Sequence, residues 1–271
     1  RNGLEPPDVF AARVRFRATL TSTLYREYRL FRNDPRLRFK GAMHESIRPD
    51  LDHLQQAIGA RVVDNAAMLT HLGYEGDMTA KYRRNLPLLR EAVRINPDRL
   101  YYWNDLAQTL GGLGEIAEAV AVAREGLGRG QHRSDHGSRV MRGMLAQTLA
   151  GLLLQRGDDA RALIDEGLAV HPVNWSLLFL KARALVNSGD YREALQVLAQ
   201  LTAQDAEAIC DDDLSHDIRI FGCYAHDLAG VAHLRMENRQ QAADAFARAF
   251  AAAPDELAYR VKALALGAAA A

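Results

Sequence analysis

Two adjacent residues, His44 and Glu45, are the strongest candidates for chemistry in this sequence. An imidazole is a good metal ligand, or a hydrogen-bond donor to a diphosphate, near neutral pH. A carboxylate serves as a general base when it reaches the proton of an attacking group. The alternative role is structural, because the pair precedes a predicted helix that begins near Ser46 and could cap that helix. The residue types allow both roles.

Three other groups of residues have the composition of a functional site but lie in segments where a site is not expected. Residues 50–52 read Asp-Leu-Asp, yet they lie on a predicted helix and are expected to form a solvated face. The acidic run 211–213 lies inside the helical region and is interpreted as a first-turn signal of the next helix. His132 and His136 are four residues apart, which is ligand spacing on a helix, but the surrounding glycines favour a loop. No metal site is predicted.

Composition indicates a soluble globular protein and excludes some functions. The chain has 271 residues, of which 48% are hydrophobic and 25% charged, with 34 basic and 34 acidic side chains. This balance gives no electrostatic case for a nucleic-acid partner, and no apolar run reaches the ~20 residues that cross a bilayer. Cys210 and Cys223 have no metal-type spacing with histidine. Two thiols fit a reducing compartment, so a cytoplasmic location is predicted.

Positive charge is concentrated locally. Nine basic residues lie between positions 13 and 40, against only Glu27 and Asp34. They are Arg13, Arg15, Arg17, Arg26, Arg29, Arg32, Arg36, Arg38 and Lys40. Such an excess could face a phosphate-bearing ligand or an acidic lipid surface. The solvated face of a sheet is the alternative, and the sequence leaves both open.

The first third of the chain has a strand-like pattern. Apolar and polar residues alternate over 13–20, which predicts a strand. A second strand is expected to end at the turn signal Asn33-Asp34-Pro35, and a third at 37–41. A helix from Ser46 to Ile58, with Gly59 as its C-cap, and a strand over 62–69 complete this region. The pattern predicts a small α/β or α+β unit.

The remainder of the chain has a helical period and internal repeats. The tetratricopeptide pattern places small, Ala, large apolar, small and Pro positions at fixed spacings. Gly230, Ala242, Phe246, Ala249 and Pro254 meet all of them. Partial matches begin at Ala107 and Ala182, an isolated second helix is expected before Pro97, and residues 202–222 form an insertion. The hairpin around Gly157 is two residues short, which predicts a short or irregular second helix. Each hairpin buries its apolar face only against a neighbour, so the predicted fold class is mainly α, a tetratricopeptide-type solenoid.

The first third also resembles a known enzyme family. Residues 29–33 read Arg-Leu-Phe-Arg-Asn, residues 39–45 end in His-Glu, and residues 71–74 read His-Leu-Gly-Tyr. This order of motifs resembles the end of the catalytic domain in family-2 (GT-A type) glycosyltransferases. Bacterial members of that family often carry tetratricopeptide repeats directly afterwards. The resemblance implies that residues 1–76 are the C-terminal part of such a domain and that residues 77–271 are its appended repeats.

The resemblance also implies roles for individual residues. By analogy, His44 reaches the metal or the sugar diphosphate, and Glu45 orients an acceptor hydroxyl or holds His44. Arg29 and Arg32 would approach phosphates, because a guanidinium matches phosphate geometry, or would lie on the outer face of a strand. His71 would contact the site or simply end its strand. A nucleotide sugar and a divalent metal, Mg or Mn, are implied only for the intact enzyme.

The chain begins without Met, and we expect it to start inside a domain whose donor-binding half is missing. Alone, it is therefore predicted to transfer no sugar. The first hypothesis is the C-terminal portion of an inverting glycosyltransferase whose repeats bind a protein acceptor or partner. The alternative is a non-catalytic tetratricopeptide adaptor, and a weaker one is a repeat protein of envelope polysaccharide assembly. Tyr101, Tyr102 and Trp103 are expected either to form an aromatic platform for a peptide or to lie in the core.

Overall fold

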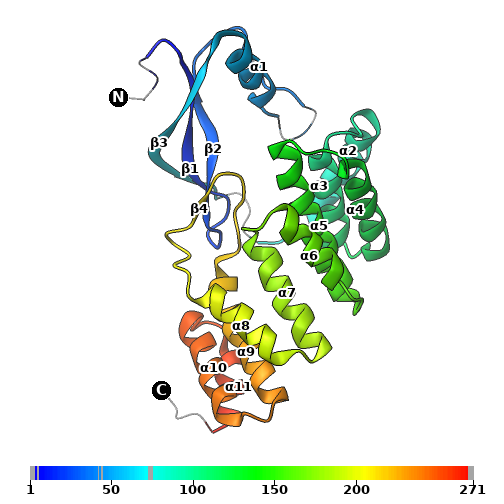
Figure 1. Ribbon diagram of the computed structural model, residues 1–271, viewed down its shortest axis with the longest axis vertical. Coiled ribbons are helices and arrows are strands. Elements are labelled where there is room, and N and C mark those ends of the chain that lie inside the picture. Colours follow the sequence, from blue (N-terminus) through cyan, green and yellow to red (C-terminus); the bar gives the residue numbers. More distant parts are fainter. Residues whose placement is uncertain (1–3, 5, 42, 44, 73–75, 268–271) are drawn as a thin grey trace.

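The computed structural model describes residues 4, 6–41, 43, 45–72 and 76–267. A small sheet with one helix lies beside a stack of helices that runs away from it (Figure 1). The change from strands to helices falls between β3 (Arg61–Thr70) and α2 (Thr79–Ile95). The predicted class, a mainly helical solenoid preceded by a small strand-containing unit, is confirmed.

The sheet is built around β1 (Val9–Arg17). β2 (Leu24–Phe31) pairs with β1 antiparallel, and β3 pairs with it parallel on the other side. A short fourth strand, β4 (Cys210–Asp211), comes from the helical region and pairs parallel with β2, giving the order β3-β1-β2-β4. The sheet therefore contains segments from both parts of the chain.

The first strand differs from its prediction. It begins at Val9 rather than at Arg13 and ends at Arg17. As the central strand of the sheet, β1 is buried on both faces in its first half. A doubly buried strand has a continuous apolar run instead of alternation, so the start of β1 carried no period-two signal.

The strand expected at 37–41 is wrong. Within the described residues, this segment contributes only an isolated bridge between Lys40 and Ser46. One of its amides is bound by a side chain instead, because the Arg38 amide donates to the Asp50 carboxylate at 3.0 Å. Lys40 also contacts this carboxylate, and the hydrogen bond lowers the pKa of Asp50. Asp50 is thus occupied in holding this loop.

The helix α1 (Arg48–Ile58) covers one face of the sheet. Leu51 and Leu54 point into a cluster with Phe10 and Ala11 of β1. The chain leaves the helix through Gly59, whose φ of 69° is left-handed, as a C-cap glycine requires. The predicted helix, its cap and the strand that follows are confirmed.

The helical region consists of paired helices. Four hairpins follow α2, and a single helix closes the array. The pairs are α3 (Leu100–Gly112) with α4 (Ile116–Gly130), α5 (His136–Arg156) with α6 (Arg161–Val170), α7 (Trp175–Ser188) with α8 (Tyr191–Thr202), and α9 (Cys223–Arg235) with α10 (Arg239–Ala252); α11 (Leu257–Ala265) is last. The 10-residue α6 is the shortest of these paired helices, as the missing residues near Gly157 predicted.

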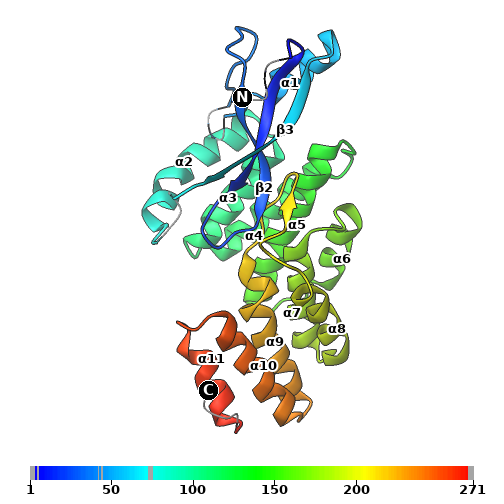
Figure 2. The same cartoon turned by 90° about the vertical axis from the view of Figure 1, so that its left-hand side faces the viewer.

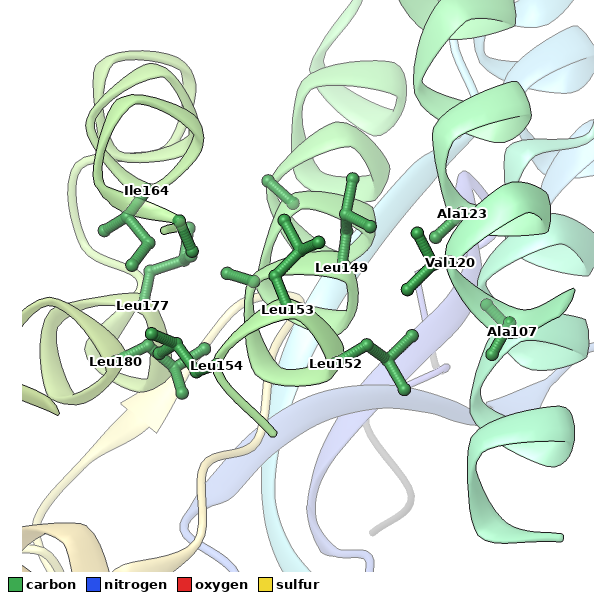
Figure 3. Packing of buried hydrophobic residues seen from close by; sticks show 14 of the residues in the cluster. Ala107, Val120, Ala123, Leu149, Leu152, Leu153, Leu154, Ile164, Leu177 and Leu180 are labelled. Carbon is green, nitrogen blue, oxygen red and sulfur yellow. The ribbon is translucent and has the colours of Figure 1, made fainter. Parts of the chain in front are cut away.

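The helices form two layers. The first helices α3, α5, α7 and α9 contact one another along the array as well as their own partners, so they form the inner layer. The second helices form the outer layer. Figure 3 shows the buried side chains that join successive hairpins, with Leu149 and Leu153 of α5 between α4 on one side and Ile164 and Leu177 on the other. Each hairpin thus completes the core of its neighbour.

The insertion between α8 and α9 has an unexpected course. We call residues 203–217 the acidic strap; they contain six carboxylates and no Lys or Arg. The strap runs up to the end of the sheet, where it supplies β4, before η1 (Ile218–Phe221) starts the next hairpin (Figure 1). The interpretation of 211–213 as a first-turn signal is wrong, because Asp217 caps η1.

Candidate functional site

The inner layer carries several polar, aromatic and apolar side chains at regular helical spacing, most of them at least partly exposed. A stripe of α3 carries Tyr101, Asn104 and Gln108, and the facing stripe of α5 carries Thr148. Further along, α7 carries Phe179 and Arg183, and α9 carries Tyr224, Leu228, Val231 and Arg235. The three- and four-residue spacings place each set on one helix face.

An amide network joins the first two inner helices. Thr148 donates to Asn104 Oδ1 at 2.8 Å, and Gln108 Nε2 lies 3.3 Å from the same hydroxyl. Asn104 is only 1% exposed, and its Nδ2 has no hydrogen-bond partner in the described part of the chain. A buried donor without a partner costs ~1–3 kcal/mol. The network therefore lacks one hydrogen-bond acceptor, for Asn104 Nδ2, among the described residues. Gln108 is its exposed member.

The third and fourth inner helices form an aromatic contact. The rings of Phe179 and Tyr224 are tilted with centroids 6.3 Å apart, and both are half-buried. Arg183 lies one turn beyond Phe179 and makes no ion pair with any described residue. By contrast, Arg219, whose guanidinium covers Tyr224, is held by three side-chain hydrogen bonds to Asp217. Aromatic rings beside a guanidinium without an ion pair among the described residues suit a ligand that has one apolar side chain and an acidic side chain next to it.

The predicted catalytic pair is only partly visible. Glu45 is exposed in the loop between β2 and α1, whereas His44 lies outside the described residues. The N-cap residue of α1 is Ile47, which has no side-chain cap hydrogen bond, so Glu45 does not cap the helix; the Arg48 amide donates to Ser46 Oγ at 3.1 Å. Their catalytic roles stay predictions.

The other residues from the family resemblance have structural contacts. The Arg29 guanidinium lies over the Phe16 ring at 4.7 Å. Arg32 donates to the carbonyls of Val9 at 2.6 Å and Pro6 at 2.5 Å, which ties the start of the chain to the end of β2. The His71 ring is 6.4 Å from Phe16, just after β3. Phe16 thus brings Arg29 and His71 to one face of the sheet, whereas Arg32 is turned to the backbone; Gly73 and Tyr74 of the same motif lie outside the described residues.

The predicted aromatic platform divides in two. Tyr102 is fully buried, and the Trp103 indole donates to the Pro97 carbonyl at 2.7 Å from a buried position. Tyr101 is half-buried on the inner face. Of the three aromatic residues, Tyr101 alone is half-buried rather than buried, and the sequence pattern did not single out Phe179 or Arg183. The sequence signal that could have found Phe179 and Arg183 is their spacing of four residues on the first helix of a hairpin, on either side of Ala182 of the repeat pattern.

The arginines of the first third mostly have partners inside the protein. Arg13 pairs with Asp64 at 2.9 Å, Arg36 with Asp34 at 2.7 Å, and Arg17 with Glu207 of the acidic strap at 2.5 Å. Arg36 lowers the pKa of Asp34 to about 2 through this hydrogen bond. These three arginines have partners within the protein, which neither alternative for the basic stretch, a ligand-facing surface or a solvated sheet face, had predicted.

The described residues contain neither a cluster of metal ligands nor a membrane-spanning helix. In the part of the chain that the structure describes, His, Cys, Asp and Glu nowhere gather in threes that could hold a metal ion. These residues therefore supply no donor set for the divalent metal that the family resemblance implies. None of the helices among them is long and apolar enough to cross a membrane.

Comparisons with known proteins agree with the helical architecture. Residues 145–210 match the family model for the tetratricopeptide repeat. No curated protein sequence matches the chain. A solved structure of nearly identical TPR-like repeats from Podosopora anserina is 20% identical, with a TM-score of 0.50, over 66% of this chain and 90% of that one.

Two further solved structures give lower scores. The thermophilic TPR protein TTC0263 of Thermus thermophilus is 19% identical, with a TM-score of 0.47, over 69% of this chain and 91% of that one. YrrB, described as a TPR protein with an unusual peptide-binding site, is 18% identical with a TM-score of 0.49, over 67% of this chain and 83% of that one. The family match over residues 145–210 and the paired-helix geometry support a tetratricopeptide-like solenoid for the helical region.

Proposed function

We propose that the array is a non-catalytic binding scaffold for a protein partner and that its inner layer holds an extended peptide segment of that partner. The observation that carries this proposal is Arg183, which has no ion pair among the described residues and lies one turn from the Phe179–Tyr224 contact. A peptide with an acidic side chain near a large apolar one would pair with the guanidinium and cover the two rings. Gln108 and Thr148 would bind its backbone.

The test uses the purified 271-residue chain and a random dodecapeptide library. We expect selected peptides to be enriched in Asp or Glu close to an aromatic or aliphatic residue. Arg183→Glu is expected to weaken the best peptide about tenfold or more, because hydrogen bonds to charged groups contribute ~1.5–3 kcal/mol. Arg124→Glu, the same charge reversal on exposed α4 of the outer layer, is the matched control and should bind unchanged. Equal affinities for the two variants would exclude the inner site.

A second candidate is that residues 1–76 are the C-terminal part of a family-2 glycosyltransferase. Its support is the order of elements around the motif residues: β2 holds Arg29 to Phe31, Glu45 lies in the next loop, α1 and β3 follow, and His71 comes directly after β3. In this candidate the nucleotide sugar, and the divalent metal that assists it, would be bound mainly by residues beyond those described. Glu45 would orient the acceptor, which the repeats would hold.

Two measurements test this candidate. The 271-residue chain alone is expected to turn over none of a panel of nucleotide sugars supplied with Mn²⁺. In any longer natural form that is active, His44→Ala should lower turnover at least tenfold without changing the circular-dichroism spectrum, whereas His132→Ala in the repeat loop should not. Undiminished transfer by the His44 variant would remove His44 from the site.

A further inference from the structure

The acidic strap joins the two parts of the molecule through backbone pairing. The Leu24 amide donates to the Ile209 carbonyl at 3.2 Å, the Thr23 amide to the His216 carbonyl at 2.8 Å, and the Ile218 amide to the Thr21 carbonyl at 2.9 Å. The first of these bonds belongs to the pairing of β4 with β2 at the edge of the sheet (Figure 2), and the other two extend the contact along residues 21–23. The strap thus behaves as a strand that the helical array (α2 to α11) adds to the sheet of the α/β unit (β1, β2, α1 and β3).

Ion pairs run along the same contact. Glu207 pairs with Arg17 at 2.5 Å and Asp212 with Arg13 at 3.2 Å, so two carboxylates face the basic side of β1. Asp213 lies 3.6 Å from Arg48 of α1 and 2.6 Å from His136 of α5, and therefore touches both parts of the molecule. The hydrogen bond from Arg17 lowers the pKa of Glu207, so this carboxylate is charged over the whole neutral range.

Few other contacts hold the α/β unit in place. Among the described helices and strands, the pairing of β2 with β4 is the main contact between the α/β unit and the segments that follow α2. Smaller contacts come from the loop at Gly41, which lies against the side chains of Arg99 and Tyr102, and from Met43, which packs against the largest cluster of the array. The strap is therefore the principal described attachment, and its carboxylates are partly solvent-exposed, with Glu207 at 64% and Asp212 at 67%.

We infer that the acidic strap is an ionic latch: it docks the α/β unit on the array, and salt or loss of the strap's charge releases that unit while the helices stay folded. Exposed ion pairs weaken as salt screens them, since the Debye length falls from about 10 Å at 0.1 M to about 3 Å at 1 M. The repeats keep their core without the ion pairs, because the two largest clusters are shared among successive hairpins, and Ala206 and Ile209 of the strap pack against the second of them through apolar contacts that do not depend on charge. This inference is independent of whether the inner layer binds a peptide.

Hydrogen exchange followed by mass spectrometry tests the latch on the full chain. The variant is Glu207→Gln/Asp212→Asn/Asp213→Asn, which removes charge with little change of shape. We expect exchange at residues 21–25 and 207–218 to become about tenfold faster, from three ion pairs of modest strength. The wild type should respond in the same way when NaCl is raised from about 0.05 M to about 1 M. Amides of α5 and α7 should keep their wild-type rates.

The matched control removes three charges elsewhere. Glu166→Gln/Glu193→Gln/Asp255→Asn changes exposed residues of the array outside the strap, and we expect wild-type exchange at 21–25 and 207–218. Unchanged exchange in the strap variant, or insensitivity to salt, would overturn the ionic latch. A uniform rise across all helices would overturn it too, because the strap would then be part of the array's own fold.

Discussion

At the residue scale, buried polar groups mark the place where the sheet meets the repeats. His216 of the strap is 2% exposed. Its Nδ1 lies 2.9 Å from Ser176 Oγ, and the backbone amide of His216 donates to Thr23 Oγ1 at 2.9 Å. In the described part of the chain its Nε2 has no partner. Burial lowers the pKa of His216 to about 4, with His171 adding repulsion and Asp211 opposing it. The imidazole is therefore held neutral.

This arrangement predicts a pH-dependent stability. An unfolded histidine has a pKa of 6.5 against about 4 in the fold, so the unfolded state binds more protons between these values and stability rises with pH there. The contribution is complete above about pH 6.5 and lost as the pH falls to about 4, by up to ~3 kcal/mol. Urea unfolding between these pH values should show the loss, and His216→Gln should flatten it.

The control for that prediction is His132→Gln in the exposed loop before α5, which should keep the wild-type pH profile. If His216→Gln leaves the profile unchanged, the pH dependence arises from other groups, and the buried imidazole is not its source.

At the element scale, small residues set how closely the helices of a hairpin approach. Gly230 of α9 faces Phe246 of α10, and a Cβ built at Gly230 would lie 2.5 Å from that ring. This contact explains the repeat spacing, because the ring fills the space that a side chain would otherwise take. Gly151 of α5 lies in a helix too, but a Cβ there meets nothing within 4 Å in the described structure.

The two glycines form a matched pair for mutation. Gly230→Ala should destabilise the protein by ~1–3 kcal/mol through overpacking against Phe246. Gly151→Ala should be neutral or stabilising by up to ~1 kcal/mol, because alanine favours helix and no clash opposes it. Urea unfolding at pH 7.5 measures both. Similar effects at the two sites would mean that helix propensity, not the ring contact, determines the cost.

At the scale of the whole molecule, the hydrophobic clusters divide along the chain. One cluster joins α1 to the sheet, whereas the two largest lie in the array, with Met43 as a contributor from the first part. The α/β unit and the array therefore have separate hydrophobic cores, and they meet at the acidic strap. This division is what lets a charged segment act as the connection.

A fragment of residues 77–271 should consequently fold without the sheet. We expect a helical circular-dichroism spectrum and a cooperative thermal transition, since hairpin stacking supplies the core. Residues 207–218 should exchange rapidly in this fragment, because β4 has lost its partner strand. A mainly disordered spectrum would contradict the separate cores.

Sequence patterns predicted the parts of this fold that depend on local spacing. The helix α1 with its Gly59 cap, the isolated α2, the shortened α6 and the hairpin of Gly230 and Phe246 all follow from residues close together in the chain. The start of β1 was missed because a strand buried on both faces does not alternate. The aromatic platform was only partly placed, since helix register decides that Tyr102 and Trp103 turn inward.

By itself, the sequence determined the repeat architecture, because small residues at fixed spacing permit only one close packing of neighbouring helices. It also determined that a strand-containing unit precedes the repeats. Only the tertiary structure decided where the arginines of β1 point and what the acidic insertion does. Asp212 and Arg13 lie far apart in the chain, and a contact of that range is set by the docking of two folded units, which no local spacing records.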